Sequence, residues 1–232
     1  AMDTWVVPCQ HCRTPNCVNA CPEGAIRKDP QTGTVVIDKD TCNGCNAVEG
    51  ELTTDKSFTS PCKANCPAHM NVQGYVQLAA KGKFQEALRL MKEDNPLPAI
   101  CGRVCHHPCE SNCNRSNIDE PVAINAIKRF VADLDLNADT RHVPDIKKRK
   151  GDKVAVIGSG PAGLSCAYFL AREGYPVTIF EKETVVGGML TTGIPSYRLP
   201  RDLIEAEIQV IRDMGVDIKT GVAFGKDVTA EQ

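Results

Sequence analysis

The sequence predicts a multidomain protein in which cysteine-rich and all-α regions precede a partial α/β unit. Twelve of the thirteen cysteines lie within the first 113 of the 232 residues, so the two halves differ sharply in composition. Apolar side chains recur at helical spacing between residues 60 and 136. From residue 153 onward a strand, a glycine-rich turn and a helix follow one another, which is typical of a βαβ start.

The first 136 residues are predicted to form two small regions. Residues 1–52 are rich in loops, and the turn at 29–33 before Val35–Ile37 predicts a hairpin. Residues 53–136 are predicted to be helical, with amphipathic segments near 72–79 and 84–91 on either side of Gly82. A third segment carries apolar side chains that we assign to core packing: Ile124, Ile127, Phe130, Val131 and Leu134.

The second half changes pattern after a polar stretch. Residues 137–152 lack periodicity, and we interpret them as a linker whose basic run, Lys147–Lys150, is solvated. Residues 153–232 are predicted to form the first part of a Rossmann-like domain, in which Val154–Ile157 is a buried parallel strand. The remaining elements expected here are helices near 162–172 and 201–214 and strands near 177–180 and 216–219.

Charge and hydropathy exclude several classes of function. The 27 basic and 29 acidic residues give a net charge of −2, and no basic face predicts nucleic-acid binding. No segment resembles a signal peptide, and no apolar run reaches the roughly 18 residues that a membrane span needs. We therefore expect a cytoplasmic protein without a membrane span, in which dense cysteine indicates metal binding.

The first cysteine run has the spacing of iron–sulfur ligands. It comprises Cys9, Cys12, Cys17 and Cys21 before Pro22, with Cys42 and Cys45 returning later. A tight loop supplies three thiolates to one cluster, and the cysteine before proline turns to a second cluster. Residues 5–45, including His11, resemble the ferredoxin-like electron-transfer subunits of hydrogenases and molybdenum oxidoreductases. The resemblance implies a ferredoxin-like [4Fe-4S] domain.

Both predicted clusters of this domain lack a fourth ligand. Val48 and Leu52 stand where two further cysteines would fall, so the sites are incomplete or a stretch is absent after Cys45; we favour an absent stretch. Two alternatives stay open, a zinc ribbon formed by the two Cys-x2-Cys pairs and a disulfide framework.

A second cysteine set lies in the helical region: Cys62, Cys66, Cys101, Cys105, Cys109 and Cys113. Spacing of four places successive cysteines on one side of a helical turn, with Gly102 and Pro108 bending the path. The segments PCKANCPAHM, NPLPAICGRVCHHPCESNCNR and EPVAINAIKRF resemble the N-terminal cluster domain of the glutamate synthase small subunit family, including the matching domain of dihydropyrimidine dehydrogenase.

That resemblance implies one or two [4Fe-4S] clusters here and two to four in the whole chain. It places Cys62 and Cys113 at one cluster, and Cys66, Cys105 and Cys109 at the other. Some relatives have an amide or carboxylate ligand where this chain has Lys128, and a Cys-x2-Cys pair where it has Thr54 and Ser57. Cys101 is therefore a candidate ligand. His106 and His107 could tune or ligate a cluster, although turn residues before Pro108 are the better interpretation.

The turn Gly158-Ser159-Gly160-Pro161-Ala162-Gly163 predicts a dinucleotide site. Gly158 permits the tight turn, Gly160 lets the backbone approach a pyrophosphate, and Gly163 lets the helix lie close to the strand. The helix N-terminus would then face the phosphates. Glu181 ends the next strand about twenty residues later, where a carboxylate accepts hydrogen bonds from a ribose.

Family resemblance, rather than spacing, favours FAD at this turn. VAVIGSGPAGLSCAYFLAREGYPVTIFEK and VGGMLTTGIPSYRLP resemble the FAD half of the same family. The resemblance adds Lys182 and places Phe224 near the adenine. Cys166 lies inside the predicted first helix, where we interpret it as a packed core thiol rather than a redox group. The resemblance also implies a set of residues in contact with the flavin: Gly187, Gly188, Met189, Leu190 and Arg198.

These features together predict an electron-transfer flavoprotein subunit. Relatives carry a further NAD(P)H domain, so we expect the chain to be a fragment of a protein that passes electrons from NAD(P)H through FAD and clusters to partner redox subunits or ferredoxin. No nucleophile or acid–base constellation is visible, and no catalytic side chain is assigned. Two alternatives are an electron-transfer subunit without a nicotinamide site, as in a hydrogenase or formate dehydrogenase complex, and a zinc-stabilised interaction module.

Overall fold

The computed structural model describes residues 18–19, 21, 23–31, 35–38, 41 and 60–229. The predictions for Cys9, Cys12, Cys17, Cys42 and Cys45 lie outside these residues. The chain divides into two compact units, one formed by Ala1–His69 with His107–Ala123 and the other by Met70–His106 with Ile124–Gln232. The domain boundaries expected from the sequence stay a prediction.

The first unit contains short elements. Strand β1 (Ile26–Lys28) pairs antiparallel with β2 (Val35–Ile37), so the predicted hairpin is present. The turn between them is supported by Asp29, whose carboxylate accepts a hydrogen bond from the backbone N–H of Gln31 at 2.7 Å. Helix α2 (Pro61–Ala64) packs against α6 (Pro108–Ser111), and a 3-10 turn at Asn114–Asn117 follows. Both helices begin with proline, whose fixed φ suits a first helical turn.

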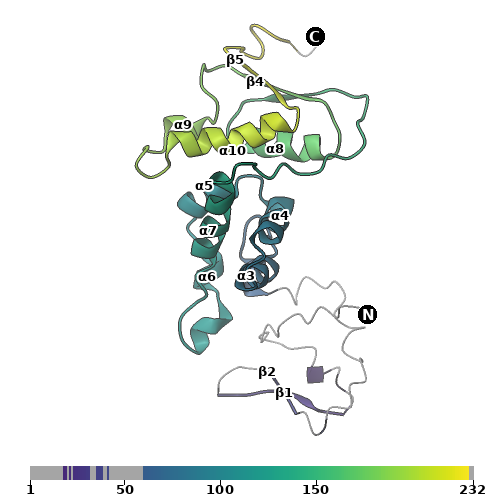
Figure 1. The fold of residues 1–232 in the computed structure, drawn as a ribbon, viewed down its shortest axis with the longest axis vertical. Helices are drawn as coiled ribbons and strands as arrows, with labels where there is room; N and C mark the ends of the chain where they lie inside the picture. The colour runs from purple at the N-terminus through teal and green to yellow at the C-terminus, as the bar shows by residue number, and fades with distance from the viewer. Residues whose placement is uncertain are drawn as a thin grey trace. The chain divides into compact units, whose positions relative to one another are not determined.

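Four helices of the second unit stand together in Figure 1: α3 (Val72–Ala80), α4 (Phe84–Asp94), α5 (Pro98–Val104) and α7 (Ile124–Leu136). The side chain of Asn71 caps α3 by accepting a hydrogen bond from Gly74 N–H. Gly82, at φ +72°, makes the reversal between α3 and α4. Helix α7 packs against α3, α4 and α5.

The buried face of α7 differs from the one predicted from its apolar residues. Phe130 and Leu134, expected in the core, are exposed, and Phe130 meets Phe84 edge-on at the surface. The buried stripe instead includes Lys128 and Asp135 beside Ile124, Val131 and Ala132. Two charged side chains therefore face the interior, and each of them needs compensation there.

The α/β part of this unit is a three-stranded parallel sheet in the order β3 (Val154–Ile157), β4 (Val177–Glu181) and β5 (Asp217–Thr220). Helix α8 (Pro161–Arg172) connects the first two strands. The short α9 (Met189–Thr192) and the long α10 (Arg201–Asp213) connect the second and third. Helices α8 and α10 lie together on one side of the sheet (Figure 1).

Strand β3 is parallel, as predicted, but it is not buried on both faces. Val156 is buried beneath the helices, whereas Ala155 and Ile157 are exposed on the opposite face. The prediction of a wholly buried strand is therefore wrong for the residues described. Helices cover one face of the sheet, and the strand's outward side chains stay open.

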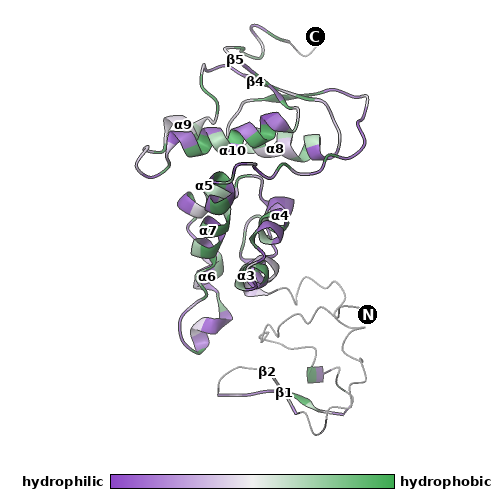
Figure 2. Cartoon of the chain, in the orientation of Figure 1, coloured by the Kyte–Doolittle hydropathy of each residue, from purple (hydrophilic) through white to green (hydrophobic). Residues whose placement is uncertain are grey.

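One hydrophobic core joins the α5 region and part of α7 to the α/β part of the second unit. It joins Leu97, Ala99 and Ile100 of the α5 region to Leu164 and Tyr168 of α8, and it continues through the sheet to α10. Hydrophilic and hydrophobic residues alternate along α7 and α10 in Figure 2, as expected of helices with one buried face. Among the residues described, no helix is long and apolar enough to cross a lipid bilayer.

Candidate functional site: a dinucleotide cradle and two thiol sites

The first glycine turn has the geometry that the sequence predicts. Gly158 has φ +92°, and its N–H donates to the carbonyl of Phe180 at 2.8 Å, which fixes the turn against β4. A Cβ at residue 163 would overlap the Gly158 carbonyl oxygen, so α8 can start close to β3 only with glycine there. A Cβ at residue 160 would meet no atom within 4 Å. The backbone at Gly160 is therefore open to a ligand.

A second glycine turn, at Gly187 and Gly188, lies against the first. The N–H of Gly187 donates to the carbonyl oxygen of Ser159 at 3.1 Å and approaches the Ser159 hydroxyl at 3.3 Å. A Cβ at residue 188 would lie 3.0 Å from the Cα of Gly160. Both Gly187 and Gly188 have positive φ, which glycine adopts without strain. The structure thus brings together two predicted site segments, 158–163 and 187–190.

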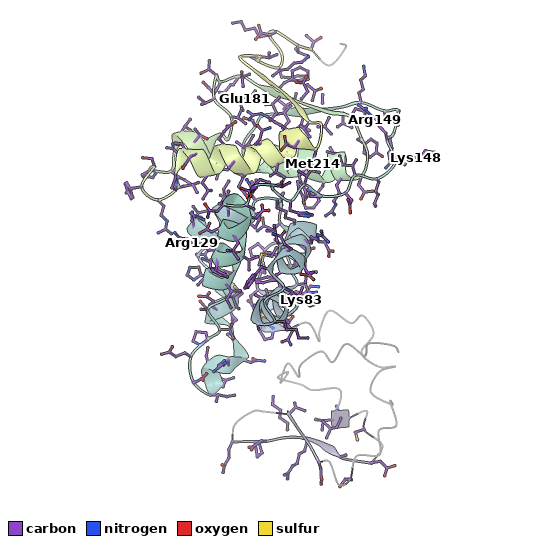
Figure 3. All side chains as sticks on the ribbon, viewed as in Figure 1. Lys83, Arg129, Lys148, Arg149, Glu181 and Met214 are labelled. Atoms are coloured by element: carbon purple, nitrogen blue, oxygen red, sulfur yellow. The ribbon has the colours of Figure 1, made fainter. Side chains whose placement is uncertain are left out.

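Glu181 lies at the end of β4, beside the first glycine turn (Figure 3). One of its carboxylate oxygens accepts hydrogen bonds from the Ser159 N–H at 2.7 Å and hydroxyl at 2.6 Å, and the other accepts from Glu183 N–H at 2.9 Å. Burial alone would raise the pKa of Glu181, but these hydrogen bonds lower it below its ordinary value. Glu181 is therefore ionised and tied to the turn, and one lone pair remains, on the oxygen that accepts from Glu183 N–H.

The other predicted cofactor residues surround this turn with differing exposure. Leu190 is buried in the core, whereas Met189 has 69% of its surface exposed. Lys182 and Arg198 are exposed on loops. Phe224 is half exposed and forms an isolated bridge with Val228. Their roles toward a cofactor stay predictions.

Four thiols of the first unit lie in or directly after α2 and α6: Cys62, Cys66, Cys109 and Cys113. Cys62 is in α2, and its Sγ is 3.4 Å from the Ser60 hydroxyl. Burial raises the pKa of the Cys62 thiol, and the negative charge of a Cys113 thiolate adds to this rise. The assignment of Cys62 and Cys113 to one cluster stays a prediction. Cys109 is buried in α6, and Cys21 and Cys66 are half-buried.

Two of the thiols of the second unit, Cys101 and Cys105, follow one another across the end of α5. Cys101 is in the helix, while Cys105 is its C-cap with an extended backbone, so the helix does not continue through the cysteine series. Burial raises the pKa of Cys101, and Lys128 and Asn95 oppose that rise through an ammonium charge and hydrogen bonds. The Nζ of Lys128 lies 3.1 Å from the Cys101 Sγ.

The described residues fit iron by the chemistry of their donors. None of the described cysteines forms a disulfide, and their sulfur atoms are soft ligands that suit iron or zinc. In the described part of the chain, no three histidine, cysteine or acidic side chains converge as they would around a metal ion.

A buried charge network was not predicted from the sequence. Lys92 donates to the His142 carbonyl at 2.9 Å and lies 3.8 Å from Asp135, while Arg141 bridges Asp135 at 2.8 Å and Glu207 at 3.1 Å. Lys92, Asp135 and Glu207 are each 2% exposed or less. The sequence feature that could have predicted this network is a charged residue on the otherwise apolar stripe of each of α4, α7 and α10.

This network connects the thiol-bearing helices to the α/β part. Glu207 of α10 accepts a hydrogen bond from Ala99 N–H, two residues before Cys101, at 3.4 Å. The Tyr168 hydroxyl of α8 donates to the Lys92 carbonyl at 2.8 Å, and Arg172 donates to the Glu93 carbonyl at 2.9 Å. The dinucleotide cradle and α5 are thus held in one unit by buried polar contacts as well as by the shared core.

Two further side chains complete the comparison with the sequence. Cys166 was expected to be a packed core thiol, but it is exposed on α8, because Leu164, Ala167 and Tyr168 form the buried stripe of that helix. His107 has φ +45° and pairs with Glu110 at 3.1 Å. This contact supports the turn before α6.

Three family models match the chain. Residues 2–77 match a 4Fe-4S dicluster domain. Residues 55–140 match dihydropyrimidine dehydrogenase domain II, 4Fe-4S cluster. Residues 156–216 match an NAD(P)-binding Rossmann-like domain.

The full-length relatives agree with these models. The chain is 42% identical over 224 residues to the NADP(+)-dependent formate dehydrogenase subunit beta of Moorella thermoacetica, covering 87% of this chain. It is 44% identical over 177 residues to the NADPH-Fe(3+) oxidoreductase subunit beta of Geobacter sulfurreducens, covering 75%. It is 35% identical over 192 residues, covering 82%, to the glutamate synthase [NADPH] small chain of Bacillus subtilis. The chain belongs to the glutamate synthase small subunit-like family of iron–sulfur oxidoreductase subunits.

As a member of this family, the chain has the 4Fe-4S domains and the Rossmann-like domain that the sequence predicts. The matches span only 32%, 26% and 38% of the three relatives' own lengths. The activity of the whole protein therefore belongs to the proposal that follows.

Proposed function

We propose that this family member is an iron–sulfur flavoprotein subunit that passes electrons between NAD(P)H and a partner redox enzyme or ferredoxin. One observation carries the proposal: the glycine-turn cradle and the helix bearing Cys101 belong to a single compact unit with a continuous core. A site for a dinucleotide and a site for sulfur-bound iron are thus fixed with respect to each other, as one-electron transfer between two cofactors requires.

The chain's own residues would bind and orient FAD. The open backbone at Gly160 and the first-turn N–H groups of α8 suit the pyrophosphate, because free N–H groups and the helix dipole stabilise negative charge. Glu181, held by Ser159 and Glu183, has one carboxylate lone pair left for a ribose hydroxyl, on the oxygen that accepts from Glu183 N–H. A bound FAD and [4Fe-4S] clusters would supply the conversion of a two-electron hydride transfer into single-electron transfers.

The buried contacts between the helices and the α/β part would keep the two sites at a constant separation. Glu207 holds the first turn of α5 through Ala99 N–H, and Tyr168 and Arg172 hold the end of α4. Desolvation makes these polar contacts costly to break, so the joint resists hinge motion. A rigid joint suits electron transfer, in which the protein sets distance and environment while the cofactors do the chemistry.

The names of the relatives support the choice of donor and the need for partners. Two of the three are described as beta subunits and one as a small chain, and each name includes NADP(+) or NADPH. We include NAD(P)H and a hetero-oligomeric partner in the proposal on that ground. Cysteines without disulfides among the described residues agree with a reducing compartment such as the cytoplasm.

The test measures cofactor content and reduction in the full-length protein purified without oxygen. We expect FAD, iron and acid-labile sulfide in the wild type, with bleaching of the flavin absorbance by NADPH or NADH. Released NAD(P) in place of FAD would contradict the flavin assignment, and a colourless protein would contradict the whole proposal. Flavin that dithionite bleaches but neither nicotinamide does would favour an electron-transfer subunit without a nicotinamide site.

A matched pair of glycine substitutions tests the cradle itself. Gly163→Ala places a methyl group on the Gly158 carbonyl oxygen, whereas Gly151→Ala meets nothing within 4 Å. We expect Gly163→Ala to lose bound FAD while keeping iron and sulfide, and Gly151→Ala to keep all three. Full FAD in the Gly163→Ala protein would show that the dinucleotide binds elsewhere.

A further inference from the structure

Lys128 is a buried cation whose surroundings lack a matching negative charge. It lies on the inner stripe of α7 with 5% of its surface exposed, and its Nζ is 3.1 Å from the Sγ of Cys101. Within the ranges that the structure describes, none of the ion pairs includes Lys128. A neutral thiol is only a weak acceptor for an ammonium group.

Burying an unpaired charge costs several kcal/mol, so such a residue needs an anion beside it in the working protein. The Lys128 ammonium lies beside the Cys101 sulfur, and Asn95 and Cys105 also interact with that sulfur. A site that combines sulfur atoms with a fixed positive charge is suited to binding a group of net negative charge.

We propose that Cys101 ligates an iron–sulfur cluster and that Lys128 donates a hydrogen bond to its sulfur, which raises the reduction potential of that cluster. This inference rests on the proposed function, because it requires iron in the helical region. It assigns Cys101 as a ligand, and it gives Lys128 the role of setting the potential rather than of binding metal.

The direction of the effect follows from charge. A cluster held by thiolates is anionic, and reduction adds one electron and one further negative charge without making or breaking a bond. A fixed cation in a low-dielectric interior stabilises the reduced form more than the oxidised form. Hydrogen bonds to cluster sulfurs and net charge near the cluster are recognised determinants of its potential.

The experiment is a potentiometric titration of the full-length protein, reduced stepwise with dithionite and followed by the electron paramagnetic resonance signal of the reduced clusters. Lys128→Met removes the charge and keeps a side chain of similar length. Lys128→Arg keeps the charge and the donor. Arg129→Met is the matched control, since Arg129 lies on the outer side of the same helix, with its side chain 55% exposed (Figure 3).

We expect Lys128→Met to lower the reduced-to-oxidised ratio of one cluster about tenfold at fixed potential, a shift of about 59 mV for a one-electron couple. Lys128→Arg should restore most of that ratio, and Arg129→Met should leave it unchanged. An unchanged titration in Lys128→Met, or an equal shift in Arg129→Met, would overturn the inference. A signal lost from Cys101→Ser but present in Cys166→Ser would support Cys101 as the ligand.

The outcomes separate this inference from the proposed function. Protein without iron and sulfide would end both. Protein with its full iron content, an intact FAD site and a potential independent of residue 128 would leave the proposed function standing and end the inference alone. If Lys128→Met lost its cluster, Lys128→Leu would be titrated in its place, because leucine also removes the charge and offers no oxygen that could ligate iron.

Discussion

Two lysines on neighbouring helices of the same unit are both buried, but they are compensated in opposite ways. Lys92 of α4 donates to the His142 carbonyl and faces Asp135, with Arg141 and Glu207 continuing the network. Lys128 of α7 contacts the sulfur of Cys101. The first lysine has its counter-charge within the chain, whereas the second has none in the residues described.

The contrast separates a structural buried charge from a functional one. The network around Lys92 pairs two cations with two carboxylates and satisfies backbone groups, so its members depend on one another for stability. Lys128 could be replaced by an apolar side chain without leaving any carboxylate unpaired. The difference predicts that substitutions at the two sites will affect different measurements.

The largest effect is expected from breaking the Lys92 network. Asp135→Ala leaves Lys92 and Arg141 with Glu207 alone and removes the acceptor of His142 N–H. We expect the free energy of unfolding to fall by about 3–5 kcal/mol, the usual result of removing one partner of a buried ion pair. Hydrogen exchange of the α4 and α7 amides measures this decrease. The exposed Asp119→Ala serves as control, and equal protection in both variants would show that the network is not structural.

A smaller effect is expected in the pH dependence of stability. Burial raises the pKa of Glu207 to about 7 from 4.5, although Lys92 and Arg141 oppose the rise. Between these values the folded protein binds more protons than the unfolded protein, so the free energy of unfolding falls as pH rises from about 4.5 to about 7. Glu207→Gln should remove this fall, on the order of 2–3 kcal/mol, in urea titrations across that window. A persistent slope in the variant would assign the titration to another group.

A still smaller effect on stability is expected at the second buried lysine. Lys128→Met should leave the unfolding free energy of the metal-free protein within about 1 kcal/mol or raise it, since replacing a buried charge with an apolar group is often neutral or stabilising. Urea unfolding after iron removal gives the value. If Lys128→Met lowered the unfolding free energy as much as Asp135→Ala does, Lys128 would be a structural charge like Lys92, and the predicted difference between the two lysines would be wrong.

The smallest effect is expected at Lys147, an exposed lysine whose contact with Glu173 is shorter than the contacts of Lys92 and Lys128. Lys147 lies 2.7 Å from Glu173 with two thirds of its side chain exposed. We expect no change in the urea midpoint of Lys147→Ala, because solvent and salt screen the pair. A clear destabilisation would mean that the strap over the end of α8, formed by backbone hydrogen bonds from Lys147 and Lys150, depends on this charge.

Local patterns predicted much of the secondary structure and the glycine cradle. Helical periodicity located α3, α4 and α7, and the spacing of Gly158, Gly160 and Gly163 located the turn that opens α8. Such features depend on neighbours within a few residues, which sequence spacing records directly. The approach of Gly187 and Gly188 to that turn was expected only from family resemblance, since it joins segments about 28 residues apart.

The sequence by itself determined the elements, the glycine turns and a supply of thiols in the first half. Only the tertiary structure decided that Lys128 and Asp135, rather than Phe130 and Leu134, occupy the inner stripe of α7, and that Cys166 faces outward. The physical reason is that burial of a charge depends on its compensation by distant groups. Arg141 and Glu207 are 66 residues apart along the chain, and Cys101 and Lys128 are 27 apart, so no local pattern reveals either pairing.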